Sequence, residues 1–397
     1  MEKYNSRESF NFDSKLTEEG YELESVNIVQ SPSSPIRHRS ECDPMIELAG
    51  RKVFPVIVSP MGAVTDENNY KVWLDNGFIP VVPRTVDLEK RIKISEETFA
   101  SFSLSETENN VLKLSKKDEN DIPYKRYICI DIAHGTMEAL YDVCKKLRKR
   151  FGENIVIMTG NVANPEAYIF YEDAGIDYMR CSVGAGSRCV TSCNVGIHYP
   201  TASLIDGLRM QKERYEFAHG SSRTKIIADG GIKNFDEIQK CICLGADAVM
   251  SGNIFARAEE ACEPIVFLHP DNLNMADAIP QKDYLEKIEY LREYTAEYPN
   301  DEEMEDAYRK LMKRKPYREY YGMSTKKAQK ITGGSGKKTS EGIIRPIPVE
   351  YPIAKWAENM KDYMTSCMSY TGCRTIEEMK RETRLIINKS GDGAYKK

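Results

Sequence analysis

A cysteine in a glycine-rich segment is the residue with the clearest chemical potential in this chain. The segment reads Gly184-Ala185-Gly186-Ser187-Arg188-Cys189-Val190-Thr191. Glycine permits sharp turns and a close approach of the backbone to a ligand. A thiolate in such a loop can attack an electrophilic carbon, although an isolated loop cysteine is more often an inert thiol. The rest of the sequence favours the nucleophile, because other chemically suited residues recur at equivalent places.

Eight short apolar segments must position these residues. Helical patterns lie between most of them, for example over 136–151 and 235–244. Apolar strands that alternate with helices predict parallel pairing. Eight such units within about 200 residues fit an α/β fold of the (β/α)8 TIM barrel type, with a doubly wound sheet as the alternative. The expected strands are 53–59, 78–82, 99–104, 127–132, 155–159, 178–182, 225–228 and 248–251.

Ligands bind at the carboxyl ends of barrel strands, and polar or glycine residues follow six of the expected strands. These residues lie at 60–65, 131–135, 160–162, 184–191, 229–231 and 251–253. The glycine turns after the seventh and eighth strands are typical of phosphate sites. Asp229 can accept hydrogen bonds from a ribose diol, or cap a turn. Together with Cys189, the glycine turns and Asp229 indicate a nucleoside monophosphate whose base lies against the thiol.

The barrel is expected to span residues 51–385, after an N-terminal arm over 1–50 and before a polar C-terminal tail over 386–397. Residues 265–316 are strongly charged, with apolar residues recurring every third position from Leu285 to Tyr294. This pattern predicts a helical insertion packed on the barrel surface, either a solvated appendage or a partner site. The glycine-rich and basic stretch within 325–345 predicts a mobile active-site flap, with a flexible linker as the alternative.

Five motifs make the chain resemble the IMP dehydrogenase/GMP reductase family, whose members are (β/α)8 barrels. The resemblance covers most of residues 8–385 outside the insertion. The motifs are Gly-x-Gly-Ser-x-Cys-x-Thr at 184–191, Ala-Asp-Gly-Gly-Ile at 228–232, Tyr-Gly-Met-Ser at 321–324, Ser-Glu-Gly at 340–342 and Tyr-x-Gly at 370–372.

The resemblance implies a role for each matching residue. Cys189 would attack C2 of a purine nucleotide to give a covalent thioimidate, and a hydride would pass between C2 and a nicotinamide. Thr191 and Glu341 would handle protons. The substrate would be held by Ser187, Asp229, Gly230, Gly231, Gly252, Asn253, Gly322, Met323, Ser324, Ser340 and Gly342. The cofactor would be held by Arg84, Asp131, Ile132, Ala133, Val183, Gly184, Ser366 and Ser369. The family's potassium ion would be bound by the carbonyls of Gly184, Gly186 and Cys189.

Two features favour the reductase branch of the family, which converts GMP and NADPH to IMP, NADP and ammonia. Residues 325–340 lack the Arg-Tyr pair of the dehydrogenase flap. Only residues 89–98 separate the second strand region from the third, which leaves no space for the regulatory domain of most dehydrogenases. The alternatives are an IMP dehydrogenase that uses NAD, and a non-catalytic barrel that binds purine nucleotides.

The chain departs from the family pattern at three places. Gly62 replaces the usual aspartate, Pro83-Arg84 replaces a His-Lys pair, and Ser192 stands where arginine is expected. Arginine keeps the positive charge of lysine but does not release its proton. A divergent enzyme that acts on a related purine nucleotide is therefore a further alternative.

Composition sets the remaining expectations. A net charge of −5 does not favour nucleic acid as a partner. No apolar run approaches the roughly 20 residues of a membrane span, and the N-terminus does not read as a signal peptide. The eleven cysteines are scattered, and Cys241 and Cys243 are expected to be packing residues rather than metal ligands. We therefore expect a cytoplasmic protein, and the resemblance implies a homotetramer.

Overall fold

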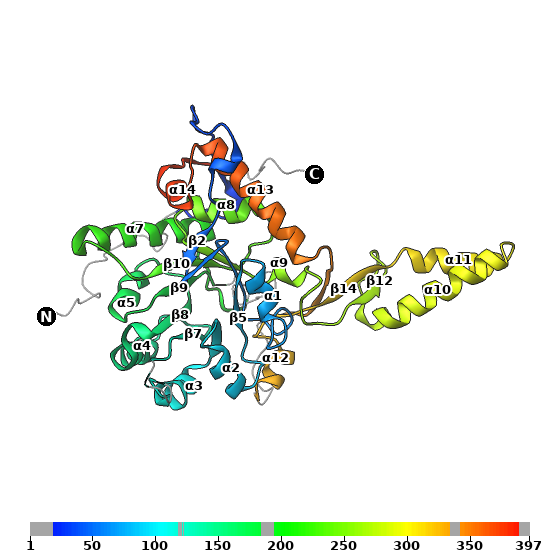
Figure 1. Cartoon of the computed structure of the whole chain (residues 1–397), viewed down its shortest axis with the longest axis horizontal. Helices are drawn as coiled ribbons and strands as arrows, with labels where there is room; N and C mark the ends of the chain where they lie inside the picture. The colour runs from blue at the N-terminus through cyan, green and yellow to red at the C-terminus, as the bar shows by residue number, and fades with distance from the viewer. Residues whose placement is uncertain (1–18, 118–120, 122, 184–193, 334–341, 389–397) are drawn as a thin grey trace.

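Eight parallel strands form a closed barrel in the computed structural model, which describes residues 19–117, 121, 123–183, 194–333 and 342–388 (Figure 1). Each strand pairs in parallel with the next along the chain, and the last pairs with the first. All eight predicted strands and the (β/α)8 architecture are confirmed. The strands are β4 (Val56–Val58), β5 (Ile79–Val82), β6 (Phe99–Phe102), β7 (Arg126–Asp131), β8 (Ile155–Val162), β9 (Tyr178–Cys181), β10 (Lys225–Asp229) and β11 (Ala248–Ser251).

Amphipathic helices cover the outside of the barrel. The helix predicted over 136–151 begins two residues later, and it buries Leu140, Val143 and Leu147 at the spacing of one helical face. A capping box between Asn234 and Glu237 starts the helix predicted over 235–244. The covering helices are α1 (Tyr70–Asp75), α2 (Leu88–Ile94), α3 (Leu104–Asn109), α4 (Glu138–Phe151), α5 (Ala167–Asp173), α7 (Thr201–His219), α8 (Phe235–Cys243) and α9 (Asn253–Ala256).

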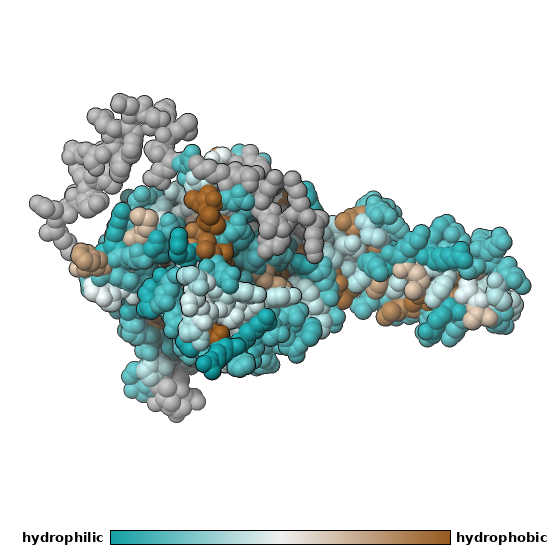
Figure 2. Space-filling view, turned by 90° about the horizontal axis from the view of Figure 1, so that it is seen from above, coloured by the Kyte–Doolittle hydropathy of each residue, from teal (hydrophilic) through white to brown (hydrophobic). Residues whose placement is uncertain are grey.

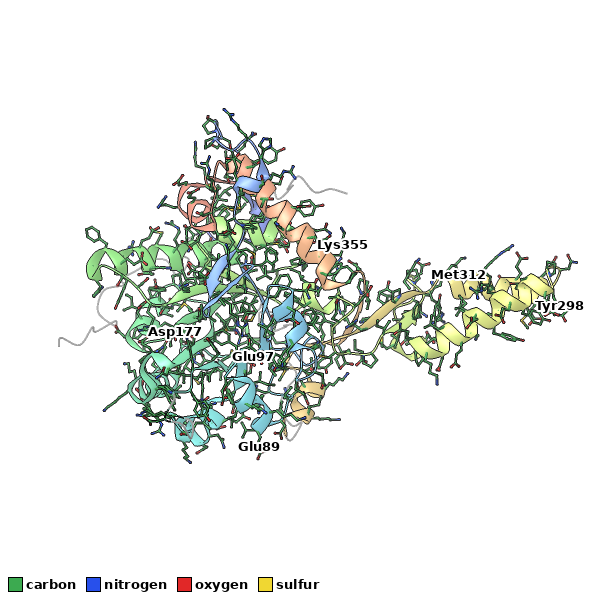
Figure 3. The ribbon with its side chains drawn as sticks, in the orientation of Figure 1. Glu89, Glu97, Asp177, Tyr298, Met312 and Lys355 are labelled. Carbon is green, nitrogen blue, oxygen red and sulfur yellow. The ribbon has the colours of Figure 1, made fainter. Side chains whose placement is uncertain are left out.

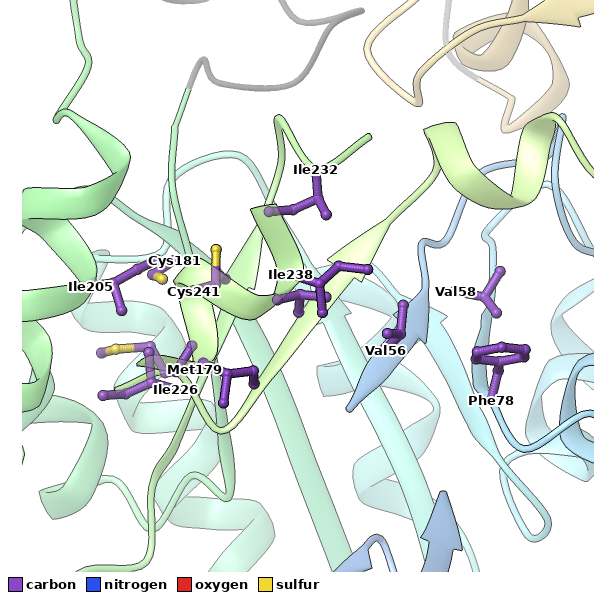
Figure 4. Close-up of a cluster of buried hydrophobic side chains, with 14 of the residues drawn as sticks. Val56, Val58, Phe78, Met179, Cys181, Ile205, Ile226, Ile232, Ile238 and Cys241 are labelled. Carbon is purple, nitrogen blue, oxygen red and sulfur yellow. The ribbon is translucent and has the colours of Figure 1, made fainter. Parts of the chain in front are cut away.

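The core has two layers, one inside the barrel and one between strands and helices. Inside, the Phe99 ring meets those of Tyr127 and Tyr178 edge to face. Figure 4 shows part of the outer layer, where Ile238 and Cys241 of α8 pack with side chains of the strands. Burial of one such isoleucine contributes about 1.5–3 kcal/mol.

A hairpin of β2 (Ile46–Leu48) and β3 (Arg51–Val53) adds Leu48 and Val53 to the inner layer. Tyr178 Oη accepts a hydrogen bond from Ala49 N at 3.0 Å. Before the hairpin, β1 (Val26–Ile28) pairs with β16 (Leu385–Ile387), so segments near the beginning and the end of the described chain lie side by side. The first two residues of the expected polar tail therefore belong to a strand.

The insertion projects away from the barrel as an arm (residues 266–320; Figure 1), so its expected packing on the barrel surface was wrong. Its helices α10 (Gln281–Glu297) and α11 (Glu302–Met312) bury Tyr284, Leu291 and Leu311 against each other. This small core contains only residues of the arm, so the two helices bury their apolar side chains without contact with the barrel. The base of the arm is an antiparallel sheet of β13 (Ile279–Pro280), β12 (Val266–Leu268), β14 (Lys315–Tyr320) and β15 (Arg345–Pro348).

Three helices complete the described chain, namely α12 (Lys326–Ile331), α13 (Ile353–Thr371) and α14 (Ile376–Glu382). Trp356 of α13 stacks on Phe235 of α8 with ring centroids 4.9 Å apart, which fixes α13 along the barrel. Within the described ranges, no helix combines the length and the apolar character needed to cross a membrane.

Candidate active site

A buried arginine joins two carboxylates at the carboxyl ends of the barrel strands. Arg180 lies two residues after Tyr178 in β9, so the alternation of the strand points both side chains into the barrel. Its Nη1 lies 2.8 Å from Asp131 Oδ1 at the end of β7, and its Nη2 lies 2.8 Å from Asp229 Oδ2 at the end of β10. Burial opposes the charge, but the carboxylates outweigh it and raise the pKa of Arg180, which therefore remains a cation.

Asp229 is held through one of its two carboxylate oxygens. Arg180 Nε donates to Oδ2 at 2.9 Å, and Asn161 Nδ2, at the end of β8, donates to the same atom at 2.8 Å. Oδ1 receives no hydrogen bond from the described residues. A carboxylate oxygen fixed in this way can accept hydrogen bonds from the hydroxyls of a ligand.

A second arginine lies on the other side of Asp131. Arg84 follows β5, and its Nε is 3.9 Å from Asp131 Oδ2. This Nε is buried and has no hydrogen-bond partner within the described part of the chain. A buried, unpaired donor on a cation is costly, so the position suits a ligand that supplies an acceptor or a negative charge.

The departures at Gly62 and Pro83-Arg84 occupy neighbouring strand ends. A Cβ atom on Gly62 would lie 2.9 Å from Thr85 Oγ1, which is closer than an ordinary contact. The aspartate that the family usually has at position 62 would therefore require the Thr85 side chain to move. The two departures form one altered side of the barrel mouth, because β4 and β5 are paired.

The predicted phosphate side is built from turns after β10 and β11. Gly230 and Gly231 have φ angles of 120° and 77°, a region that favours glycine. A Cβ atom on Gly252 would overlap Met61 Sδ and lie 2.6 Å from Tyr320 Oη. The ends of β4, β11 and β14 therefore meet here, and Asn253 follows directly as the first residue of α9.

The predicted contacts to the base lie after β14. A Cβ atom on Gly342 would be 2.8 Å from Ser324 Oγ, so Gly342 lies beside the segment of Gly322 and Met323. Thr325 caps α12 by accepting a hydrogen bond from Ala328 N. Residues on either side of 334–341 are thus brought together.

A charged network holds α12 in place. Lys327 Nζ lies 3.0 Å from Glu263 Oε1 and 2.6 Å from Glu319 Oε2, and Tyr321 Oη donates to Glu263 Oε1 at 2.7 Å. Although burial opposes its charge, these carboxylates raise the pKa of Lys327. The network ties the base of the predicted flap to the base of the arm.

A histidine supports the segment that leads to Cys189. His198 Nδ1 lies 3.0 Å from the carbonyl oxygen of Val183, and its Nε2 lies 2.6 Å from Glu22 Oε1. Burial lowers the pKa of His198, but the hydrogen bonds to Val183 and Glu22 outweigh this and raise it. The protonated ring can donate to both partners.

The structure does not bring every predicted residue to the mouth. Ile132 and Ala133 follow Asp131, but Ser366 and Ser369 lie in the C-terminal half of α13. The Ser369 carbonyl there accepts a hydrogen bond from Ser34 Oγ at 2.7 Å, and α13 contacts the 3-10 helix Arg39–Glu41 that leads to β2. Ser366 and Ser369 are therefore separated from Asp131 within one chain.

Several predicted residues lie outside the described residues, namely Gly184, Gly186, Ser187, Cys189, Thr191, Ser192, Ser340 and Glu341. The predicted nucleophile, both proton-handling residues and the potassium position are among them. Val183, which comes directly before this segment, follows β9 at the end of the barrel that holds Asp229.

The thiols that are described are not arranged around a metal. Cys241 and Cys243 are buried in α8, as predicted for packing residues. Burial raises the pKa of both thiols. No group of histidine, cysteine and carboxylate side chains suited to a metal ion occurs within the described ranges.

Arg180 and Lys327 were not predicted from the sequence as site residues, and Asn161 was predicted only as a strand-end residue. The sequence could have indicated Arg180 as a site residue, since it is the single charged residue in an apolar strand. Lys327 had no such signal, because it lies among several lysines of a basic stretch, and its partner Glu263 is 64 residues away in the sequence.

The sequence is similar to those of known proteins. A model of the IMP dehydrogenase / GMP reductase domain matches residues 100–276. A GMP reductase from Lactobacillus delbrueckii subsp. bulgaricus is 28% identical over 93% of this chain and 95% of its own length. A GMP reductase from Staphylococcus saprophyticus is 32% identical over 61% of this chain and 72% of its own length. An inosine-5'-monophosphate dehydrogenase from Chlorobaculum parvum is 29% identical over 65% of this chain and 44% of its own length.

Proposed function

The chain belongs to the IMP dehydrogenase/GMP reductase family, and from this premise we propose that it reduces GMP to IMP with NADPH and releases ammonia. The short connection between β5 and β6 is the observation that favours the reductase reaction over the dehydrogenase reaction. Only residues 83–98 lie between these strands, and α2 occupies seven of them. The regulatory domain of most dehydrogenases has no place there. The match with a GMP reductase over 95% of its length supports the same choice.

The described residues supply the binding part of the proposed reaction. Asp229 Oδ1 accepts hydrogen bonds from the ribose hydroxyls, while Arg180 and Asn161 hold Oδ2. The backbone N–H groups of the turns at Gly230 and Gly252 donate to the phosphate. A phosphate and a diol fixed at adjacent strand ends leave the base over the centre of the mouth.

Cys189 performs the covalent step in this proposal. Its sulfur bonds to C2 of the purine, and protons delivered through Thr191 and Glu341 let the C2 amino group leave as ammonia. NADPH supplies the hydride that C2 accepts when the cofactor is bound. The C2–sulfur bond then breaks, the electron pair returns to Cys189 as a thiolate, and IMP is released.

The cofactor and ion assignments are finer parts of the proposal. The unpaired buried Nε of Arg84 beside Asp131 fits a polar or anionic group of a nicotinamide nucleotide. NADPH is chosen over NAD because the reductase branch uses it. Potassium would be held by the carbonyls of Gly184, Gly186 and Cys189, and the active form would be a homotetramer.

The test is to mix the protein with GMP and NADPH, and separately with IMP and NAD, both with potassium, and to follow the absorbance of the reduced nicotinamide. Loss of absorbance in the first mixture is expected, and Cys189→Ala should abolish it. The matched control, Cys367→Ala on α13, should retain it. Gain of absorbance in the second mixture would favour the dehydrogenase, and no change in either would favour a binding protein.

A further inference from the structure

The projecting arm carries an exposed row of tyrosines. Tyr290 and Tyr294 of α10 and Tyr298, which follows its last residue, are four residues apart, with ring centroids separated by 6.0 Å and 4.9 Å. The first and last are 58% and 50% exposed, and Tyr298 lies at the far end of the arm in Figure 3. We call these three residues the tyrosine row. Tyrosine is enriched where proteins bind one another.

Exposed carboxylates accompany the tyrosine row at the same end of the arm. Glu297 is the last residue of α10 and Glu293 lies one turn before it, and Glu302 and Glu303 lie in the first turn of α11. None of these four forms an ion pair with a described residue. Figure 2 shows the arm as mainly hydrophilic with scattered apolar side chains.

The position of Glu297 is unfavourable for the helix itself. The carboxyl end of a helix has a partial negative charge, so an acidic side chain there costs about 0.3–1 kcal/mol. The last turn of α10 contains no basic residue that would offset the cost. A charge that weakens its own helix and has no ion-pair partner among the described residues points to a cationic partner from another molecule.

The matching cations lie on α4. Lys145, Lys146, Lys149 and Arg150 are exposed in the C-terminal half of this helix. We call them the α4 basic patch. They form no salt bridge with any residue that the structure describes. In Figure 1, α4 and the arm lie at opposite sides of the molecule, so the arm does not reach the patch of its own chain.

We propose that the arm of one copy docks its tyrosine row and the four glutamates onto the α4 basic patch of a second copy. Exposed tyrosine rings attract lysine and arginine through their π faces, and complementary charges steer the encounter and fix its orientation. Two different surfaces meet in this contact, so it is head to tail. Repetition of such a contact produces a closed ring or an open chain. The inference does not depend on the reaction proposed above.

Zero-length carbodiimide cross-linking tests the contact, because it joins only carboxylates and amines that touch. Unlabelled and isotopically labelled protein are mixed, cross-linked and digested, and mixed-isotope peptides identify links between copies. We expect links between residues 293–303 of one copy and residues 145–149 of another. Absence of such links, or links from the arm to any other segment instead, would overturn the proposal.

Charge reversal provides the matched variants. Glu293→Lys/Glu297→Lys or Lys145→Glu/Lys149→Glu should lower the yield of these links at least tenfold. The four changes combined in one chain should restore it, because both partners are then reversed. The control Glu89→Lys/Glu108→Lys makes the same charge change on α2 and α3 and should leave the yield unchanged.

The expected loss of cross-links in the arm variant can be distinguished from a loss of folding. Lysine in the last turn of α10 favours the helix, so the arm variant should unfold at the same temperature as the parent protein or a higher one. A yield that stays unchanged in the arm variant, or that the combined variant fails to restore, would refute the docking.

Discussion

Replacement of Arg180 by methionine is the sharpest perturbation of the barrel mouth. It removes the cation between Asp131 and Asp229, whose side chains are only 13% and 11% exposed. Loss of one partner from a buried ion pair typically costs about 3–5 kcal/mol, because the remaining charge stays buried. We expect Arg180→Met to lower the free energy of unfolding by about that amount in urea titrations at neutral pH.

The same change should weaken nucleotide binding. Asp229 would lose two of the three hydrogen bonds that orient it, and even 1.4 kcal/mol of lost binding energy raises Kd about tenfold. Calorimetric titration with GMP should therefore show a Kd at least tenfold higher than in the parent protein.

A double-mutant cycle separates this electrostatic cause from a simple loss of packing. In the Asp131→Asn/Asp229→Asn background, no carboxylate is left without its cation, so Arg180→Met should cost at least 1 kcal/mol less. An equal cost in both backgrounds, or an Arg180→Met protein as stable as the parent, would refute the buried triad.

Three further predictions concern the supports of the site. The pKa of His198 is raised above its ordinary 6.5, so its stabilising effect is complete below about pH 6.5 and is lost as pH rises through the raised pKa. Thermal unfolding temperatures measured from pH 5 to 9 should show this decline. The His198→Gln variant should show a weaker dependence on pH. In Gly135→Ala, the new Cβ would lie 2.6 Å from the Asn161 carbonyl oxygen, so we expect the free energy of unfolding in urea to fall by about 1–3 kcal/mol. An unchanged midpoint of the urea titration would contradict the close packing. Lys327→Met should change the free energy of unfolding by less than about 1 kcal/mol, since the ion pairs of Lys327 are partly exposed. The same variant should raise KM for GMP several-fold with kcat nearly constant. Rescue of KM by Lys327→Arg would confirm a positioning role, and an unchanged KM would exclude it.

The barrel was predictable because its strands are buried on both faces. Such strands read as continuous apolar runs, and Tyr178–Cys181 is one of them. Glycine and aspartate at the strand ends located the mouth for the same reason, since the fold places all carboxyl ends on one face.

The sequence did not reveal the partners of Arg180. Its place in an apolar run was visible, but Asp131 and Asp229 are each 49 residues away and meet it only when the barrel closes. The direction of the arm was hidden for a similar reason. Helical periodicity predicted the helices, whereas pairing of residues 266–268 with 315–317 sets where they point.

The roles assigned to residues only through the family resemblance stay predictions, but the structure gives the positions of some of these residues. The segment at 322–324 lies close to Gly342, as a shared site requires. Ser366 and Ser369 lie far from Asp131 in the single chain, because α13 continues past the mouth toward the amino end of the barrel. Their role as cofactor contacts stays a prediction.

The product balance of a single turnover tests most directly whether this barrel reduces a purine nucleotide. Enzyme in excess over GMP is mixed with NADPH, and IMP, ammonia and oxidised cofactor are measured together. We expect the three products in equal amounts, and none from Cys189→Ala. Oxidised cofactor without ammonia, or no IMP from the parent protein, would contradict the proposed reaction.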